Sequence, residues 1–227
     1  INMNYRIKTI GLILFVLIGQ NLFAQTNKEK AYDKCKEAIR LMDNGNVDKS
    51  IKLLKEASKL DPESLTYPYE LALAYYMKQE YKESIKILEK YYTNPDANDR
   101  FFQLLGNSYD MIGKSEKAIE IYDKGLEKFP NSGMIYLEKG NVYWGKKDYK
   151  TALTYYEKGI EVDPNFPSNY YRATLLYCSS NEKVWGLIYG EIFMNLERKS
   201  ARTYEISKLI YNTYKSGIKI ISDTSFS

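Results

Sequence analysis

Apolar residues follow the spacing of amphipathic helices along most of the chain, and the pattern returns at a fixed interval. Gly-Asn-x-Tyr stands at residues 106–109 and again at 140–143, an offset of 34 residues. The same offset joins further pairs: Ala118 and Ala152, Tyr122 and Tyr156, Gly125 and Gly159, Pro130 and Pro164. A fixed period of this length indicates a repeat architecture, in which each unit stacks on its neighbours.

Each repeat is expected to hold two helices of about a dozen residues with a short turn between them. Residues 44–46 and 112–114 are such turns, and each contains a glycine. Asp-Pro at 61–62 and Phe-Pro at 129–130 end second helices, because the residue before proline disfavours the α region. The units begin near five positions: Ala31, Leu65, Asp99, Gly133 and Pro167.

Small residues recur where the two helices of a repeat are expected to cross. On the first helices they are Ala38, Ala72, Gly106, Gly140 and Thr174. On the second helices they are Ser50, Ser84, Ala118, Ala152 and Gly186. A glycine costs about 1 kcal/mol of helix propensity relative to alanine, so its recurrence indicates a demand of packing. We expect the two sets to face each other.

Together, the period, the small residues, the tyrosines and the terminal prolines resemble the tetratricopeptide repeat family across residues 31–198. The resemblance implies an all-α fold, an α-solenoid of about five helix-turn-helix repeats wound as a right-handed superhelix. It also implies a concave groove lined by the first helix of each repeat. Some positions depart from the family pattern. Lys34, Glu37 and Lys139 stand where the family usually has an apolar residue. Tyr91 stands where it usually has a small residue, and Gly190 where it usually has a large one.

Residues 199–221 carry isoleucines and leucine with helical spacing and predict one further amphipathic helix. An end repeat leaves an apolar face in water, so we expect this helix to cap the array. The other interpretation is that it begins another module and that the chain is an N-terminal fragment of a longer repeat protein. Residues 222–227 are a tail, and no β-sheet is expected.

Residues 1–24 have the order of a secretory signal peptide: Arg6 and Lys8, an apolar run over residues 10–18, and Ala24 before a polar stretch. The run is shorter than the roughly 20 residues that span a bilayer. We expect cleavage after Ala24, a short linker over residues 25–30, and a periplasmic or secreted product. Residue 25 is glutamine rather than the cysteine of a lipoprotein. An uncleaved anchor is the alternative.

The composition argues against most kinds of catalytic site. The 227 residues include no histidine, which excludes Ser–His and Cys–His nucleophile pairs. Phosphate-binding loops, nucleophile elbows and metal-ligand clusters do not occur. Paired carboxylates such as Glu116 and Glu120 stand beside lysines, which is typical of solvated helix surface. We therefore expect no enzyme activity, no metal and no cofactor.

The charge of the chain bears on nucleic-acid binding, and its two cysteines bear on disulfide formation. The formal net charge is +4, and removal of Arg6 and Lys8 with the signal leaves +2, with both signs interspersed. Nucleic-acid binding needs a concentrated basic face, so nucleic acid is excluded. Cys35 and Cys178 lie four repeats apart, too far for a disulfide, and we expect buried, unpaired thiols. An intermolecular bridge is the alternative.

The resemblance implies that certain residues of each first helix line the groove. The candidate binding residues are Tyr69, Tyr76, Asn107, Asp110, Asn141, Trp144, Tyr171 and Arg172. Aromatic side chains with adaptable polar neighbours are typical of protein-binding surfaces. Asn107 and Asn141 occupy equivalent positions one repeat apart, so both amides could reach one extended peptide. The competing interpretation is that the tyrosines are core residues and the asparagines bridge helices.

The sequence therefore predicts an exported protein–protein interaction scaffold that binds a peptide or protein segment in its groove. The alternative is a glycan-binding or envelope-assembly accessory module, in which Trp144 and tyrosines stack on sugars. No membrane span is expected after signal cleavage. The identity of the partner and the oligomeric state stay open.

Overall fold

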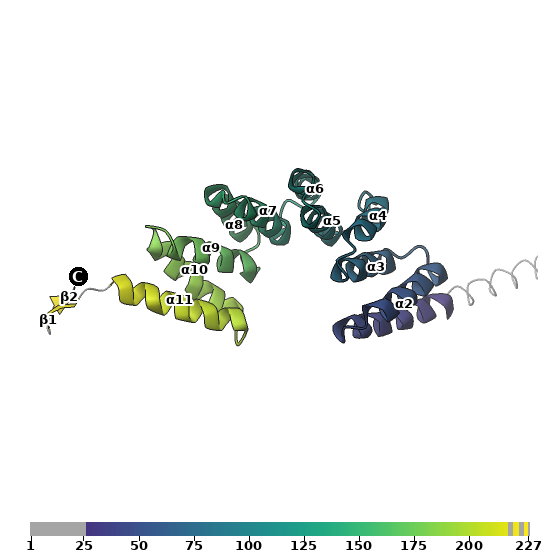
Figure 1. The fold of residues 1–227 in the computed structure, drawn as a ribbon, viewed down its shortest axis with the longest axis horizontal. Coiled ribbons are helices and arrows are strands. Elements are labelled where there is room, and N and C mark those ends of the chain that lie inside the picture. Colours follow the sequence, from purple (N-terminus) through teal and green to yellow (C-terminus); the bar gives the residue numbers. More distant parts are fainter. Residues whose placement is uncertain (1–25, 218–219, 223–224, 227) are drawn as a thin grey trace, which may run out of the picture. The chain divides into compact units, whose positions relative to one another are not determined.

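The computed structural model describes residues 26–217, 220–222 and 225–226 (Figure 1). The expected signal peptide lies outside these residues. The expected linker, residues 25–30, lies inside them from residue 26 onward, and this part is helical. It continues into the first helix of repeat one, so that a single helical segment covers residues 26–43. The prediction of a separate linker is therefore wrong for residues 26–30.

The helices that follow alternate as first and second members of the repeats. Repeats one to three continue with α2 (Val47–Leu60), α3 (Thr66–Met77), α4 (Tyr81–Tyr91), α5 (Asp99–Met111) and α6 (Ser115–Lys128). Repeats four and five hold α7 (Gly133–Gly145), α8 (Tyr149–Val162), α9 (Pro167–Cys178) and α10 (Lys183–Leu196), and α11 (Ala201–Gly217) comes after them.

Two short strands follow the last helix, β1 (Ile220–Ser222) and β2 (Ser225–Phe226), and they pair antiparallel with Ile220 opposite Phe226. The expectation of no β-sheet is therefore wrong at the tail. The predicted helix over residues 199–221 is also too long, because α11 ends at Gly217. Glycine is a poor helix former, and the β-branched residues that follow favour a strand.

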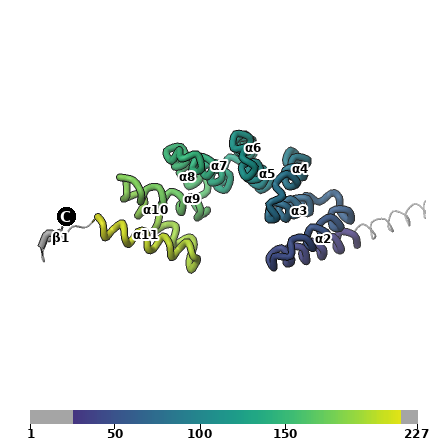
Figure 2. The backbone as a smooth tube through the Cα atoms, in the orientation of Figure 1, coloured from purple at the N-terminus to yellow at the C-terminus, as the bar shows by residue number. Residues whose placement is uncertain are grey.

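Consecutive helices pack on each other within two compact units, one up to Phe101 and one from Phe102 (Figure 2). In the first unit, α3 contacts both α2 and α4. In the second unit, every helix from α6 to α11 contacts the next one. This succession of helix-turn-helix pairs is the α-solenoid class that the 34-residue period predicts.

Glycines on first helices make room for tyrosine rings of second helices. A Cβ atom added at Gly106 would overlap the ring of Tyr122, and one at Gly140 would overlap the ring of Tyr156. Both rings are almost fully buried. The atoms nearest to these glycines belong to the tyrosine that follows Ala118 or Ala152 by one helical turn.

The turns inside the repeats share one unusual backbone conformation. Gly45, Gln79, Gly113 and Lys147 all have φ between 61° and 76°, and they stand 34 residues apart. This left-handed region suits glycine and costs other residues roughly 1 kcal/mol or more. Repeats two and four therefore carry backbone strain that repeats one and three avoid.

Two departures from the family pattern have clear packing explanations. Lys139 is buried, forms an ion pair with Asp123 of α6, and places its Nζ 4.5 Å from the centroid of the Tyr155 ring. At Gly190 a Cβ would meet Ile210 of α11. The missing large side chain is therefore replaced by one from the last helix, which packs its buried Ile206 and Ile210 with Phe193 of α10.

Candidate functional site

Three of the predicted binding residues meet in the second unit, on α7 and α9. The half-buried indole of Trp144 lies against Tyr149, with ring centroids 5.8 Å apart, and against Tyr156 at 6.4 Å. The guanidinium carbon of Arg172 lies 5.3 Å from the Trp144 ring centroid, and Tyr171 stands beside it at 5.9 Å. This is cation–π geometry, which fixes the arginine without consuming all of its hydrogen-bond donors.

Arg172 keeps its charge available. It contacts the rings of Trp144 and Tyr171, and no carboxylate among the described residues forms an ion pair with it. The charge of Arg172 also affects the pKa of the neighbouring Tyr156. Burial raises the pKa of the Tyr156 phenol, and the positive charge of Arg172 opposes that rise. The phenol stays protonated, and therefore a hydrogen-bond donor, at physiological pH.

A polar network joins α5 to α7 beside this aromatic group. The Nε2 atom of Gln103 donates to one oxygen of Glu138 at 2.9 Å. The Nδ2 atom of Asn141 donates to the other oxygen at 3.0 Å. Since both carboxylate oxygens are held, Glu138 is oriented by the fold. We call the surface that carries Gln103, Glu138, Asn141 and Arg172 the first-helix face.

Each predicted asparagine accepts a hydrogen bond from the tyrosine that fills the glycine gap of its repeat. The Tyr122 hydroxyl donates to Oδ1 of Asn107 at 2.5 Å, and the Tyr156 hydroxyl donates to Oδ1 of Asn141 at 3.0 Å. The carbonyl end of both amides thus serves the fold, as the competing interpretation expected. The Nδ2 end differs between them, because Asn141 donates to Glu138 whereas no described residue accepts from Nδ2 of Asn107.

Two further predicted residues belong to the first unit. Tyr69 is only 7% exposed and packs in the core of the first unit, against Phe101 and beneath Arg100, so its assignment to a binding surface is wrong. Tyr76 is half-buried and packs edge-on against Tyr81. In the second unit, Asp110 connects two helices, and Tyr171, which lies beside Arg172, does so as well.

These junction contacts are specific. Asp110 accepts a hydrogen bond of 2.6 Å from the Ser115 hydroxyl across the α5–α6 turn. The Tyr171 hydroxyl donates to Glu205 of α11 at 2.8 Å, and its ring packs on Phe193. Both residues connect neighbouring helices. The compact candidate site in the second unit is therefore Asn107, Asn141, Trp144 and Arg172, together with Gln103 and Glu138.

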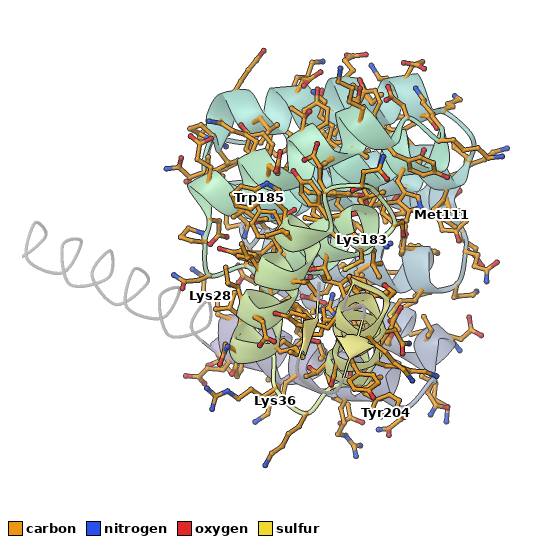
Figure 3. The ribbon with its side chains drawn as sticks, turned by 90° about the vertical axis from the view of Figure 1, so that its left-hand side faces the viewer. Lys28, Lys36, Met111, Lys183, Trp185 and Tyr204 are labelled. Atoms are coloured by element: carbon orange, nitrogen blue, oxygen red, sulfur yellow. The ribbon has the colours of Figure 1, made fainter. Side chains whose placement is uncertain are left out.

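Sequence reasoning missed a pocket in the first unit. A cavity of about 270 Å³ opens between the helix over residues 26–43 and the start of α3. Its lining residues are Tyr32, Cys35, Lys36, Ile39, Thr66 and Tyr67, of which Lys36 is labelled in Figure 3. The first four occupy groove positions of the repeat register in repeat one. Applying that register to repeat one would have found them.

Both cysteines are buried and unpaired, as the sequence predicts. Burial, with a smaller contribution from Glu70, raises the pKa of the Cys35 thiol to about 11. Burial also raises the pKa of Cys178. The thiolate is the reactive form of cysteine, so neither side chain is activated as a nucleophile at neutral pH.

Comparison with known families decides the identity of the repeats. Models described as tetratricopeptide repeat match residues 35–99, 102–132 and 134–166. The chain belongs to the tetratricopeptide repeat family. These matches cover nearly all of α2 to α8, and they include the positions of Asn107, Asn141 and Trp144. The comparison with curated proteins finds no match.

Solved tetratricopeptide repeat structures share the fold at low sequence identity. A thermophilic TPR protein from Thermus thermophilus is 14% identical with a TM-score of 0.65, over 82% of this chain and 99% of that one. PilF from Pseudomonas aeruginosa is 20% identical with a TM-score of 0.65, over 84% and 90%. A tetratricopeptide repeat protein from Parabacteroides merdae is 15% identical, with a TM-score of 0.57, over 82% and 74%.

The tetratricopeptide repeat fold is typically a non-catalytic scaffold for protein–protein interaction, and this chain has that scaffold. Residues 26–217 contain no group of three carboxylate, cysteine or histidine side chains placed to hold a metal ion. Among the described helices, none is both long enough and apolar enough to cross a membrane.

Proposed function

We propose that this tetratricopeptide repeat protein is an exported scaffold that binds an extended segment of a partner protein on the first-helix face of its second unit. The observation that carries the proposal is the state of Arg172. Its guanidinium is held near the Trp144 ring and has no carboxylate partner among the described residues. A half-buried arginine positioned in this way is a strong anchor for an acidic or carbonyl group of a partner.

The neighbouring groups suit a passing main chain. Nδ2 of Asn107 is a donor that can reach a backbone carbonyl, and Gln103 stands one turn earlier on the same helix. Glu138 and Asn141 continue the polar track on α7. The exposed part of the half-buried Trp144 side chain would contact an apolar side chain of the partner and exclude water from the adjacent hydrogen bonds.

The two asparagines can offer a partner their Nδ2 donors but not their Oδ1 acceptors. Both Oδ1 atoms already accept from buried tyrosines, so the fold uses that end of each amide. Nδ2 of Asn107 can donate to a partner without breaking a contact within the described chain, and Nδ2 of Asn141, which gives one N–H to Glu138, keeps a second N–H. Alanine at either asparagine would therefore alter stability as well as binding.

A glycan ligand has less support. Sugars stack on the open face of an aromatic ring, and here Arg172 already lies over the Trp144 ring while Tyr149 and Tyr156 pack around it. The strongly exposed aromatic side chains of the second unit include Trp185, Tyr204 and Tyr211, which lie on α10 and α11 and not on first helices of the repeats. A peptide is therefore the better ligand class for this site.

Selection of peptides from a random display library against the purified protein tests the proposal. Arg172→Gln and Trp144→Ala should each weaken binding of the selected peptides by about tenfold or more. Trp185→Ala is the matched control, because it removes the only other tryptophan of the sequence, from α10. Equal loss in the control, or full binding by both site variants, would contradict the proposal.

Export rests on the order of charged, apolar and small residues before Gln25. Mass spectrometry of the protein isolated from its native source should find a chain that starts at or near Gln25, in a periplasmic or extracellular fraction. An intact leader on a membrane-retained chain would show instead that the segment acts as an anchor.

A further inference from the structure

Helix α10 exposes a row of large apolar side chains to solvent. Val184 is 67% exposed, Ile188 43%, Ile192 37% and Leu196 38%. Trp185, beside the row, is 48% exposed and is labelled in Figure 3. The residues of the row are four positions apart, so they share one face of the helix. The opposite face is already packed in the core, through Gly186, Gly190 and Phe193.

The other repeats provide an internal control for this row. The positions equivalent to Val184, Ile188 and Ile192 lie on the second helices of repeats one to four, at multiples of 34 residues. They are Asp48, Lys52, Glu56, Lys82, Lys86, Lys90, Glu116, Glu120, Lys124, Lys150, Thr154 and Lys158. All of them are exposed, and all but Thr154 are charged. Only repeat five places aliphatic side chains there.

Packing within the chain does not explain why repeat five has aliphatic residues at positions where the other repeats have charged or polar ones. A residue at these positions faces water in every repeat, whichever side chain it carries. Exposed apolar residues scattered singly are ordinary, whereas a contiguous row marks a surface that another molecule covers. We propose that the row formed by Val184, Ile188, Ile192 and Leu196 is the contact surface of a homodimer, in which two α10 helices pack antiparallel about a two-fold axis.

The row is complementary to itself, as an isologous interface requires. A two-fold axis that crosses α10 at the level of Gly190 places Ile188 against the Ile192 position of the second copy and Val184 against its Leu196 position. Aliphatic side chains meet aliphatic side chains at each level, and no buried donor or acceptor needs a counterpart. Exposed Glu191 stands at the edge of the row and stays in the solvated rim.

Charges at the two ends of α10 favour the antiparallel orientation. Exposed Glu182 precedes the helix, and exposed Arg198 and Lys199 follow it. Antiparallel pairing brings Glu182 of one copy toward Arg198 and Lys199 of the other. Lys183, which is also exposed, lies next to Glu182 at the start of α10.

The area buried by the two rows determines the affinity expected for the dimer. Two single-helix faces bury less than about 1,200 Å² in total, which is the range of weak and transient interfaces. The dimer should therefore form reversibly, with a dissociation constant on the order of micromolar. The binding residues of the first-helix face lie on α5, α7 and α9, so this surface is separate from the site of the proposed function.

Sedimentation velocity of the purified native protein, over a concentration series up to about 200 µM, tests the proposal. The mass should rise from one copy to two. I188K/I192K, which copies the Lys86 and Lys90 of repeat two, should be monomeric throughout with an unchanged melting temperature. The matched control Thr154→Lys makes the equivalent change in repeat four and should dimerise like the wild type.

A cross-linking experiment tests the orientation. Oxidation of V184C/L196C should give a covalent dimer, because antiparallel pairing brings each introduced thiol to the other position on the partner. V184C and L196C alone should stay uncoupled. A wild type that is monomeric at every concentration, a dimer that survives I188K/I192K, or efficient cross-linking by V184C alone would overturn the proposal.

Discussion

The hydroxyl of Tyr156 donates a 3.0 Å hydrogen bond to Oδ1 of Asn141, from a ring that fills the gap left by Gly140. Tyr122 and Asn107 repeat this contact beside Gly106 one repeat earlier. The glycine, the tyrosine and the asparagine thus act as one unit. The glycine admits the ring, and the asparagine satisfies the hydroxyl that arrives with it.

This unit makes Asn141→Ala destabilising. The substitution removes the acceptor from a buried phenol, which costs about 1–3 kcal/mol. Tyr156→Phe should cost less, since no buried hydroxyl is left behind. The double variant should recover part of the loss of Asn141→Ala, because the orphaned hydroxyl is gone. Urea denaturation of the four proteins measures the coupling free energy, and additive effects would show that the hydrogen bond contributes nothing.

Gly113, in a turn, and Gly145, at the open end of a helix, should respond oppositely to alanine. Gly113 has φ of 75°, so Gly113→Ala forces a side chain into the left-handed region and should cost about 1 kcal/mol. Gly145 ends α7 with open space around it and no such φ, so Gly145→Ala should stabilise by up to about 1 kcal/mol. Thermal unfolding of both variants checks the pair. Changes of the same sign would contradict the backbone assignment.

The buried Lys139 depends on Asp123. Asp123→Asn leaves the ammonium group without its ion-pair partner and should cost about 1–2 kcal/mol, a figure reduced because Asp123 is itself half-exposed. Adding Lys139→Met should restore stability, since the apolar chain can pack on Tyr155. Glu120→Gln, which breaks two exposed pairs, is the control and should barely move the melting temperature. Failure of Lys139→Met to rescue would refute a charge-based cost.

Glu70 should make stability depend on pH. Burial raises the pKa of its carboxyl in the folded state, and Arg100 partly opposes the rise. The folded state therefore binds the proton more tightly than the unfolded state. This contribution to stability is present at low pH and is lost as pH rises from the ordinary glutamate pKa through the raised value.

Glu70→Gln should accordingly stabilise the protein at neutral pH, and the gain should vanish at acidic pH. Urea denaturation midpoints across the acidic to neutral range measure this difference. Glu63→Gln, on an exposed residue of the same unit, is the control and should give no pH-dependent gain. A constant difference between Glu70→Gln and wild type at every pH would contradict the burial argument.

The local pattern of the chain determined its architecture. Helical spacing, prolines after second helices and a 34-residue period are properties of neighbouring residues, so the repeats and their register followed from the sequence alone. The same register, read on outer positions, already distinguishes Val184, Ile188 and Ile192 from their charged equivalents, and on inner positions it marks Tyr32 and Ile39.

Only the tertiary structure decided what each inward side chain does. Tyr69 and Trp144 look alike as aromatic residues on first helices, yet Tyr69 is a core residue beneath Arg100. Trp144 instead packs under Arg172 at the half-buried first-helix face. The partner of Gly140 is likewise a ring one turn beyond the expected alanine. A repeat period gives the position of a residue on its helix, whereas burial and hydrogen bonding depend on the side chains that neighbouring helices bring to that position.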